Sequence, residues 1–186
     1  IGSQFLFAGL GYGGSCFPKD VKAMIKTAKD FECSHMLLDA ADKVNKEQRK
    51  LFIEKIKNRF GTNLSGKVFA VWGLAFKPKT NDMREAPSIT IINSLLELGA
   101  TIQAYDPKAM ESAYAIFGEK IIYSKNAYDA VTGADSLLLL TEWNEFRRPD
   151  FDRLKEQLKQ PVIFDGRNQY NAKRLTERGF CLLYTS

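Results

Sequence analysis

From residue 67 to the end of the chain, short continuous apolar runs alternate with helical segments, and this alternation limits the fold more than any other feature. An unbroken run such as Val68–Trp72 indicates a strand that is buried on both faces. A loop follows it, then a helix that begins at Pro87 and runs through Leu98, and then a second strand at Thr101–Tyr105. This order predicts an α/β fold with a Rossmann-like parallel sheet and helices on both faces.

The same pattern continues less regularly after the second strand. We expect helices at residues 128–131 and 151–158, and strands at 136–140, 162–164 and 182–184. Ligands of such sheets bind at the carboxyl ends of the strands, where the strand order reverses. The loops that follow strands are therefore the expected places for ligand contacts.

Asp106 follows the second predicted strand, where dinucleotide-binding domains carry an acidic residue for a ribose. However, the loop at residues 73–85 lacks the G-x-G-x-x-G pattern, and it is too long and too charged for a tight turn around a pyrophosphate. The sheet is therefore predicted to bind a nucleotide in a different way.

Residues 19–60 have a helical pattern with one interruption. We expect a helix at 19–31, a break at 32–34 in which Ser34 is a candidate N-cap, and a second helix at 35–60. The second helix would extend about 40 Å at about 1.5 Å per residue, which is more than a small domain needs. Its apolar pattern lapses between Val44 and Leu51, where only polar and charged residues stand.

The segment at residues 9–20 reads GLGYGGSCFPKD, with four glycines in its first six residues. Such a backbone turns tightly or passes close to a ligand, because only glycine takes a positive φ without steric cost. Cys16 comes next, and Pro18 together with the helical period after it places this cysteine at the start of a helix. The free N–H groups and the positive dipole end of a helix start favour a thiolate.

Lys19 and Asp20 follow Cys16 within one helical turn. Lys19 adds a positive charge near the thiol. A carboxylate opposes thiol ionisation, so Asp20 is better interpreted as a general base or a water-positioning group. The alternative is that Cys16 is a buried structural cysteine and that Asp20 only favours the helix start. The residue chemistry alone leaves both interpretations open.

The composition excludes several classes of protein. The chain has 186 residues, 45% of them hydrophobic and 26% charged, as in an ordinary soluble globular protein. The net charge of +5 suits anionic ligands such as nucleotides, but it is too weak and too dispersed for a nucleic-acid partner. No apolar run approaches the roughly 18 residues of a membrane span, so no membrane partner is expected.

Cysteine and histidine usage argues against disulfides and metals. Cys16, Cys33 and Cys181 are odd in number and widely spaced, which fits a reducing compartment and predicts a cytoplasmic protein. His35 is the only histidine and has no Cys, His or acidic partner at metal-ligand spacing, so no metal site is expected. The chain starts at Ile1 without a basic leader and looks like a cut end.

Three motifs carry a resemblance to a known family. The run at residues 9–20 resembles the active-site segment of the UDP-glucose 6-dehydrogenase family, within the wider UDP-glucose/GDP-mannose dehydrogenase superfamily. The run AFKPKTNDMREAPS at 75–88 is similar to the AFKP…D-x-R-E-S/A-P segment of the family's UDP-binding domain, and FDGRN at 164–168 looks like a further family run. The resemblance extends from about residue 5 to residue 179.

The resemblance implies a C-terminal portion of such an enzyme. Residues 1–60 would hold the active-site loop and a long central helix that forms a homodimer. Residues 61–186 would form the Rossmann-like UDP-binding domain. The N-terminal NAD-binding domain and the family's catalytic lysine would lie upstream, so we expect this chain alone to be inactive.

The reaction that the resemblance implies is the NAD-dependent, four-electron oxidation of UDP-glucose to UDP-glucuronate. In this family a cysteine captures the intermediate aldehyde as a thiohemiacetal, a second oxidation gives a thioester, and water releases the acid. Cys16 matches that nucleophile, and Asp20 matches the residue that handles protons and water.

The resemblance also assigns binding residues. Lys19 and Arg84 correspond to contacts with the NAD cofactor. The residues that correspond to contacts with the UDP-sugar substrate are Phe5, Leu6, Phe7, Ala8, Gly9, Gly13, Phe76, Lys77 and Arg167. Phe7 departs from the family, which more often has a polar or charged residue there.

Several alternatives stay open at this point. Lys77 and Arg167 can be solvated surface charges, and Arg84 can simply pair with Asp82 or Glu85. The substrate can be GDP-mannose, although Phe17 after the cysteine favours UDP-glucose. A different class of function is a non-catalytic module for nucleotide-sugar binding or dimerisation, with an inert Cys16.

Overall fold

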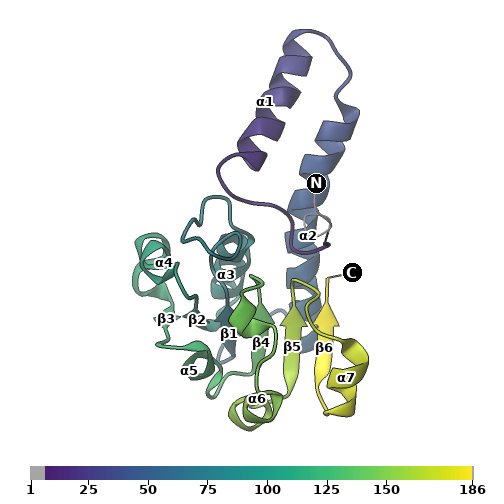
Figure 1. Cartoon of the computed structure of the whole chain (residues 1–186). Coiled ribbons are helices and arrows are strands. Elements are labelled where there is room, and N and C mark those ends of the chain that lie inside the picture. The colour runs from purple at the N-terminus through teal and green to yellow at the C-terminus, as the bar shows by residue number, and fades with distance from the viewer. Residues whose placement is uncertain (1–6, 186) are drawn as a thin grey trace.

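The computed structural model of this protein describes residues 7–185 and combines a helical arm with an α/β domain (Figure 1). The arm is formed by α1 (Phe17–Asp30) and the first half of α2 (Met36–Phe60), which lie side by side. The second half of α2 runs down to the sheet, and there Phe52 and Ile56 are buried in the core.

The two predicted helices are confirmed, each with a shift of one or two residues at its start or end. The predicted N-cap is wrong. His35 precedes the first turn of α2 instead of Ser34, and its Nδ1 lies 3.1 Å from the carbonyl oxygen of Cys33. The break at Glu32 has a left-handed φ of 54°, which ends α1 and reverses the chain.

A parallel sheet of six strands forms the centre of the α/β domain, in the order β3-β2-β1-β4-β5-β6. The strands are β1 (Val68–Trp72), β2 (Thr101–Tyr105), β3 (Ile122–Tyr123), β4 (Ser136–Leu139), β5 (Val162–Asp165) and β6 (Cys181–Tyr184). The predicted α/β class and parallel sheet are therefore confirmed. The sequence prediction missed β3, which is too short to give an apolar run.

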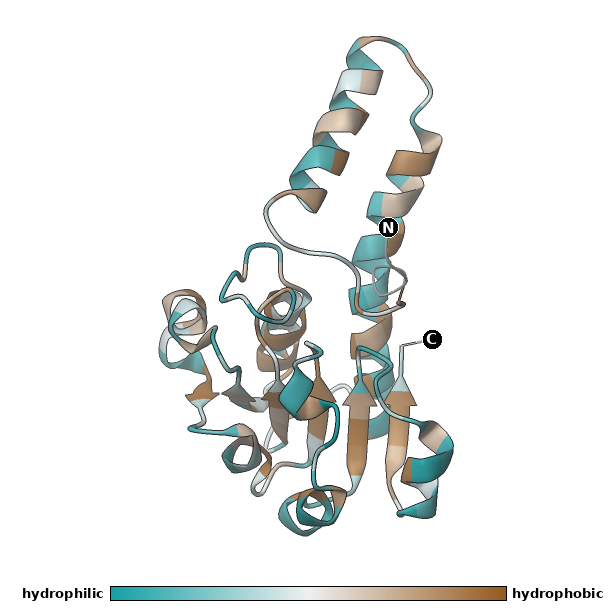
Figure 2. Cartoon of the chain, in the orientation of Figure 1, coloured by the Kyte–Doolittle hydropathy of each residue, from teal (hydrophilic) through white to brown (hydrophobic). Residues whose placement is uncertain are grey.

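Helices cover both faces of the sheet, as continuous apolar strands require. The helices of this domain are α3 (Pro87–Glu97), α4 (Met110–Phe117), α5 (Ala127–Val131), α6 (Phe151–Gln157) and α7 (Ala172–Glu177), with short 3-10 turns η2 (Gly118–Lys120) and η3 (Asn144–Phe146). The second half of α2 packs on one face with α3 and α4. The other face carries α5, α6 and α7. Figure 2 shows the apolar strands between these layers.

Packing shows how the two parts of the chain are joined. The division into units at 1–60 and 61–186 stays a prediction. The buried apolar residues of α2, which are Phe52, Ile53 and Ile56, share one core with β1 and α3. The helix that leaves the α/β domain is therefore anchored in it, which fixes the arm to the sheet.

The strand order reverses between β1 and β4, so the crevice typical of doubly wound sheets lies at the carboxyl ends of these strands. The segment that carries the glycines (residues 8–16, called the glycine segment below) comes to this edge. Its Leu10 is fully buried in the core and packs on Gly166, just after β5. The predicted position of the ligand-binding loops therefore coincides with the position of the glycine segment.

Candidate active site

Cys16 ends the glycine segment and stands directly before the first turn of α1. Its side chain is exposed, and the Ser15 hydroxyl oxygen lies 3.6 Å from its sulfur. The Asp20 amide donates a 2.8 Å hydrogen bond to the Cys16 carbonyl oxygen. The prediction that Cys16 begins a helix is confirmed, and the alternative of a buried structural cysteine is wrong.

Lys19 and Asp20 are both exposed in that first turn. Lys19 Nζ and Asp20 Oδ1 form an ion pair at 3.5 Å. The N-terminus of α1 and the Lys19 ammonium both favour negative charge in this place. The surroundings therefore suit an anionic ligand beside Cys16.

The glycine segment packs against the loop that follows β1 (residues 73–86, called loop 73–86 below). The Gly14 amide donates a 2.7 Å hydrogen bond to the Arg84 carbonyl oxygen. A Cβ on Gly13 would lie 2.5 Å from the carbonyl oxygen of Glu85, so only glycine allows this approach. The structure thus places the cysteine segment in direct contact with the loop on which substrate contacts were predicted.

Loop 73–86 presents Phe76, Lys77 and Arg84 near Cys16. The Phe76 ring lies against Gly14, and the Lys77 ammonium sits 5.2 Å from the centroid of that ring. The pKa of Arg84 is raised, first by its hydrogen bond to Asp82 and then by the negative charge of that carboxylate.

Arg84 forms a two-oxygen ion pair with Asp82, at 2.7 Å from Nη2 and 3.0 Å from Nε. This pairing, through the hydrogen bonds of the guanidinium, lowers the pKa of the Asp82 carboxyl. The sequence left open whether Arg84 binds a ligand or pairs with a nearby acid. The structure shows the ion pair, which is exposed on the arginine side and can be opened by a competing anion.

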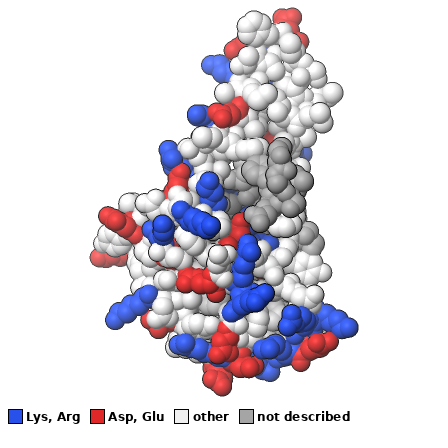
Figure 3. Space-filling model, viewed as in Figure 1, with Lys and Arg blue, Asp and Glu red and all other residues white. Residues whose placement is uncertain are grey.

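Arg167 follows β5 and contacts the start of the glycine segment, whereas loop 73–86 contacts Gly13 and Gly14 near its end. Its Nε lies 2.7 Å from Glu142 Oε2, and its Nη2 donates a 2.9 Å hydrogen bond to Glu142 Oε1. Gly9 packs directly on the Arg167 guanidinium, and Asn168 donates to the Ala8 carbonyl oxygen. The loop after β5 therefore contacts the start of the same glycine segment that loop 73–86 contacts near Gly13 and Gly14. Figure 3 shows Lys and Arg side chains on the visible face of the α/β domain, with acidic side chains between them.

The Arg167 loop is shaped by a fully buried carboxylate. Asp165 accepts hydrogen bonds from the amides of Arg167, Gln169 and Tyr170, at 2.9, 2.7 and 2.8 Å. Burial raises the pKa of Asp165, although these backbone hydrogen bonds oppose the rise. The hydrogen bonds fix the turn that directs Arg167 towards the glycine segment.

The sequence of this chain matches two profiles of one protein family. The sequence profile described as "UDP-glucose/GDP-mannose dehydrogenase family, UDP binding domain" matches residues 70–172, and the profile of the same family's central domain matches residues 1–47. The chain belongs to the UDP-glucose/GDP-mannose dehydrogenase family.

Curated relatives and solved structures of this dehydrogenase family cover nearly the whole chain. A protein named UDP-glucose 6-dehydrogenase from Pseudomonas aeruginosa is 42% identical over 97% of this chain and 41% of its own length. One of the same name from Rhizobium meliloti is 43% identical, with the same coverage. The structure of a UDP-glucose dehydrogenase from Pyrobaculum islandicum superimposes with a TM-score of 0.83 and 31% identity, over 99% of this chain and 39% of that one. The chain thus spans about 40% of the length of these dehydrogenases.

Asp106 has a structural role in this dehydrogenase domain that its position in the sequence did not reveal. Its buried carboxylate accepts hydrogen bonds from two amides of loop 73–86, that of Leu74 at 2.7 Å and that of Ala75 at 3.1 Å. It also accepts hydrogen bonds from the amides of Lys108 and Ala109, each at 2.8 Å, and from the Trp143 indole N–H at 3.1 Å. An acid that is occupied in this way holds the loop and is not available for a ribose.

Two polar residues of α2, Asn45 and Arg49, were missed as contributors to the site. Each is only 8% exposed, and both contact the backbone of Tyr12 in the glycine segment. They fall within the polar stretch that interrupts the apolar pattern of α2. A polar pair four residues apart on one helix face was the available signal.

Three further residues were predicted to contact the substrate. Phe5 and Leu6 lie outside the described residues, and Phe7 is 64% exposed. Across residues 7–185, no three His, Cys, Asp or Glu side chains gather as a metal site would require. Within the same span, every helix is too short or too polar to cross a bilayer.

Proposed function

We propose that this chain is the C-terminal part of an NAD-dependent UDP-glucose 6-dehydrogenase in which Cys16 is the nucleophile. The observation that carries the proposal is the packing of the Cys16 segment against loop 73–86, through the Gly14 amide and the Arg84 carbonyl. The proposal is supported because this contact joins a helix start that bears a thiol to a loop that bears Lys77 and Arg84.

The proposed chemistry of this chain centres on one sulfur. The Cys16 thiolate adds to the carbonyl carbon of the aldehyde formed from the sugar alcohol, and the resulting alkoxide takes up a proton to give a thiohemiacetal. Oxidation of that adduct leaves a thioester. Water then attacks the thioester, the carboxylic acid leaves, and the sulfur regains its free form. Asp20, one turn into α1, is the proposed base for that water.

The cofactor NAD⁺, when bound, supplies the hydride acceptor for both oxidations. The described residues do not form a site for the whole dinucleotide, because loop 73–86 lacks the glycine fingerprint and Asp106 is occupied by backbone amides. Lys19 and Arg84 are therefore proposed only as outlying contacts with its phosphates. The rest of the cofactor site is assigned to sequence outside this chain.

The proposed substrate is UDP-glucose rather than GDP-mannose. The support comes from the two relatives of 42% and 43% identity, both of which are named UDP-glucose 6-dehydrogenase. Lys77 and Arg167 lie on the two loops that contact the glycine segment, and Arg can bind a phosphate through two parallel N–H groups. Phe76 offers an apolar ring next to them.

Calorimetric titration of the chain with UDP and with GDP tests the nucleotide site. We expect UDP to bind and GDP to bind at least about tenfold more weakly. The variant Lys77→Ala removes a charge-assisted contact and is expected to weaken UDP binding by about 10- to 100-fold. The matched control Lys173→Ala, an exposed lysine of α7, should leave the affinity unchanged. Equal affinity for UDP and GDP would contradict the assignment to UDP-glucose.

We also propose that the helical arm forms a homodimer. Exposed apolar side chains gather on α1, the turn after it and the first half of α2: Met24 (58%), Phe31 (76%), Met36 (78%), Leu37 (87%) and Val44 (54%). Figures 2 and 3 show the arm projecting from the α/β domain with apolar segments and few charges on the visible face. A second copy of the same arm would cover these side chains.

The variant Leu37→Glu tests the dimer, because a charge in a buried apolar contact is costly unless it is paired. We expect the dimer dissociation constant to rise by at least about tenfold. Sedimentation velocity over a concentration series measures this change. Lys173→Glu introduces a glutamate on α7, away from the arm, and should leave the dimer intact. A monomer in the parent protein would refute the proposal.

The cytoplasm is the proposed location of the reaction. Cys16, Cys33 and Cys181 are all exposed and unpaired, which suits a reducing compartment.

A further inference from the structure

Asn45 of α2 holds the glycine segment by its backbone. The Tyr12 amide donates a 2.6 Å hydrogen bond to Asn45 Oδ1, and Asn45 Nδ2 donates a 3.2 Å hydrogen bond to the Tyr12 carbonyl oxygen. One side chain thus satisfies both backbone groups of the same residue. A Cβ on Gly11 would lie 2.2 Å from Asn45 Oδ1, so the glycine at that position is what lets the segment reach α2.

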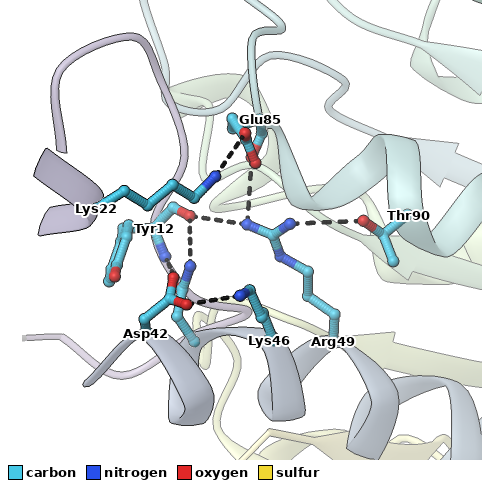
Figure 4. Close-up of polar contacts among 8 residues, drawn as sticks. Tyr12, Lys22, Asp42, Lys46, Arg49, Glu85 and Thr90 are labelled. Carbon is cyan, nitrogen blue, oxygen red and sulfur yellow. Dashed lines mark hydrogen bonds and ion pairs between the residues drawn. The ribbon is translucent and has the colours of Figure 1, made fainter. Parts of the chain in front are cut away.

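Arg49 lies one turn further along α2 and joins two segments that are far apart in the sequence (Figure 4). Its Nη2 donates to the carbonyl oxygens of Tyr12 at 2.9 Å and Glu85 at 3.2 Å, and its Nη1 lies 3.5 Å from Thr90 Oγ1. The guanidinium is therefore shared between the glycine segment, loop 73–86 and α3.

The environment of Arg49 is unusual for a buried cation. The side chain is only 8% exposed, and burial lowers the pKa of its guanidinium while the negative charge of Glu85 opposes that shift. Among the described residues, no carboxylate forms an ion pair with Arg49. Backbone carbonyl oxygens take the place of the usual carboxylate partner, so the charge serves to hold backbone in place.

Glu85 is the residue that makes this connection possible. Its φ of 52° lies in the left-handed region, which a non-glycine residue adopts only when its surroundings require it. In this conformation its carbonyl oxygen meets Arg49 and Gly13, while its side chain pairs with Lys22 of α1 at 3.2 Å. The end of loop 73–86 therefore touches α1, α2 and the glycine segment together.

We propose that Arg49 and Asn45 are positioning residues for Cys16, which hold the glycine segment and loop 73–86 as one unit. Arg49 contacts neither the sulfur nor the expected substrate position directly. It acts through the Tyr12 and Glu85 carbonyls, four residues before Cys16 and one residue after Arg84. The inference rests on the proposed function for its catalytic consequence, but its structural part is independent of that function.

Two variants of the full-length gene product test the proposal. Arg49→Met keeps the length of the side chain and removes the hydrogen bonds, and Arg49→Lys keeps the charge but cannot bridge the same carbonyls as a planar fork. The control Arg59→Met removes an exposed arginine near the other end of the same helix, where it donates to Gln160. All measurements are made well below the unfolding temperature of each variant.

The first readout is amide hydrogen exchange of the peptide spanning residues 9–17. We expect its exchange to become at least about tenfold faster in Arg49→Met, to change less in Arg49→Lys, and to stay at the parent rate in Arg59→Met. An unchanged exchange rate in Arg49→Met would overturn the proposal. This readout needs no catalytic activity, so it separates a failure of the positioning role from a failure of the proposed function.

The second readout is the steady-state oxidation of UDP-glucose. Misplacing the sulfur relative to the bound sugar should lower kcat by about 10- to 100-fold in Arg49→Met, with a smaller change in KM and partial recovery in Arg49→Lys. Faster exchange with an unchanged kcat would overturn the link to Cys16, because the segment would then be loosened without a consequence for catalysis. Should Arg49→Met not fold, the Arg49→Lys variant carries both readouts.

Discussion

Replacing Cys16 with alanine is expected to reduce the oxidation of UDP-glucose by the full-length gene product by on the order of 10³-fold or more. The reason is chemical: without the sulfur, neither the thiohemiacetal nor the thioester can form. The affinity for the sugar nucleotide should change by less than about threefold, because the side chains proposed to bind it lie on loop 73–86 and on the loop after β5. The thiol is not one of the proposed binding groups. Steady-state kinetics and UDP titration of the same preparation measure both quantities.

The control for this variant is Cys33→Ala, which removes another exposed, unpaired thiol of the chain. It should retain parental kcat. Activity within tenfold of the parent in Cys16→Ala would sink the nucleophile assignment. Together with intact UDP binding, that outcome would favour the alternative of a nucleotide-sugar-binding module in which Cys16 is inert.

The sequence predicted those parts of the fold that depend on local signals. Continuous apolar runs identified β1, β4 and β5, because strands covered on both faces contain few polar residues. The helix start at Cys16 was likewise predictable, since Pro18 and the period after it are local features. The short strand β3 and the helices α4 and α7 were missed. In β3 only two residues pair, and in α4 only Ala113 and Phe117 are buried.

The parts of the site that the sequence could not reveal depend on contacts between distant segments. Nothing near Arg49 in the sequence indicates that its guanidinium would meet the carbonyls of Tyr12 and Glu85. Arg84 illustrates the same limit: both ligand binding and an ion pair with Asp82 were compatible with its neighbours. Periodicity assigns a residue to a face, but the partner of a buried polar group is set by the tertiary fold.

Asp106 provides the clearest case of such a tertiary role, and its replacement should have the largest effect on stability. The carboxylate is 1% exposed, and five N–H donors point at its two oxygens. In Asp106→Ala these donors lose their acceptor in a place that water reaches poorly. Each buried donor left unpaired costs about 1–3 kcal/mol, and partial relaxation will recover some of the sum.

We therefore expect Asp106→Ala to lower the free energy of unfolding by at least about 3 kcal/mol, measured by urea denaturation. Asp106→Asn should fall between the parent and the alanine variant, because it keeps one acceptor oxygen but turns an N–H₂ group towards other donors. Asp129→Ala, which removes an exposed carboxylate from α5, is the matched control and should change stability by less than about 1 kcal/mol. Since two of the five donors belong to Leu74 and Ala75, at the start of loop 73–86, Asp106→Asn should also weaken UDP binding under conditions in which it is fully folded. Parental stability in Asp106→Ala would mean that loop 73–86 is held by its other contacts, with Arg49 and the glycine segment, and not by the carboxylate beneath it.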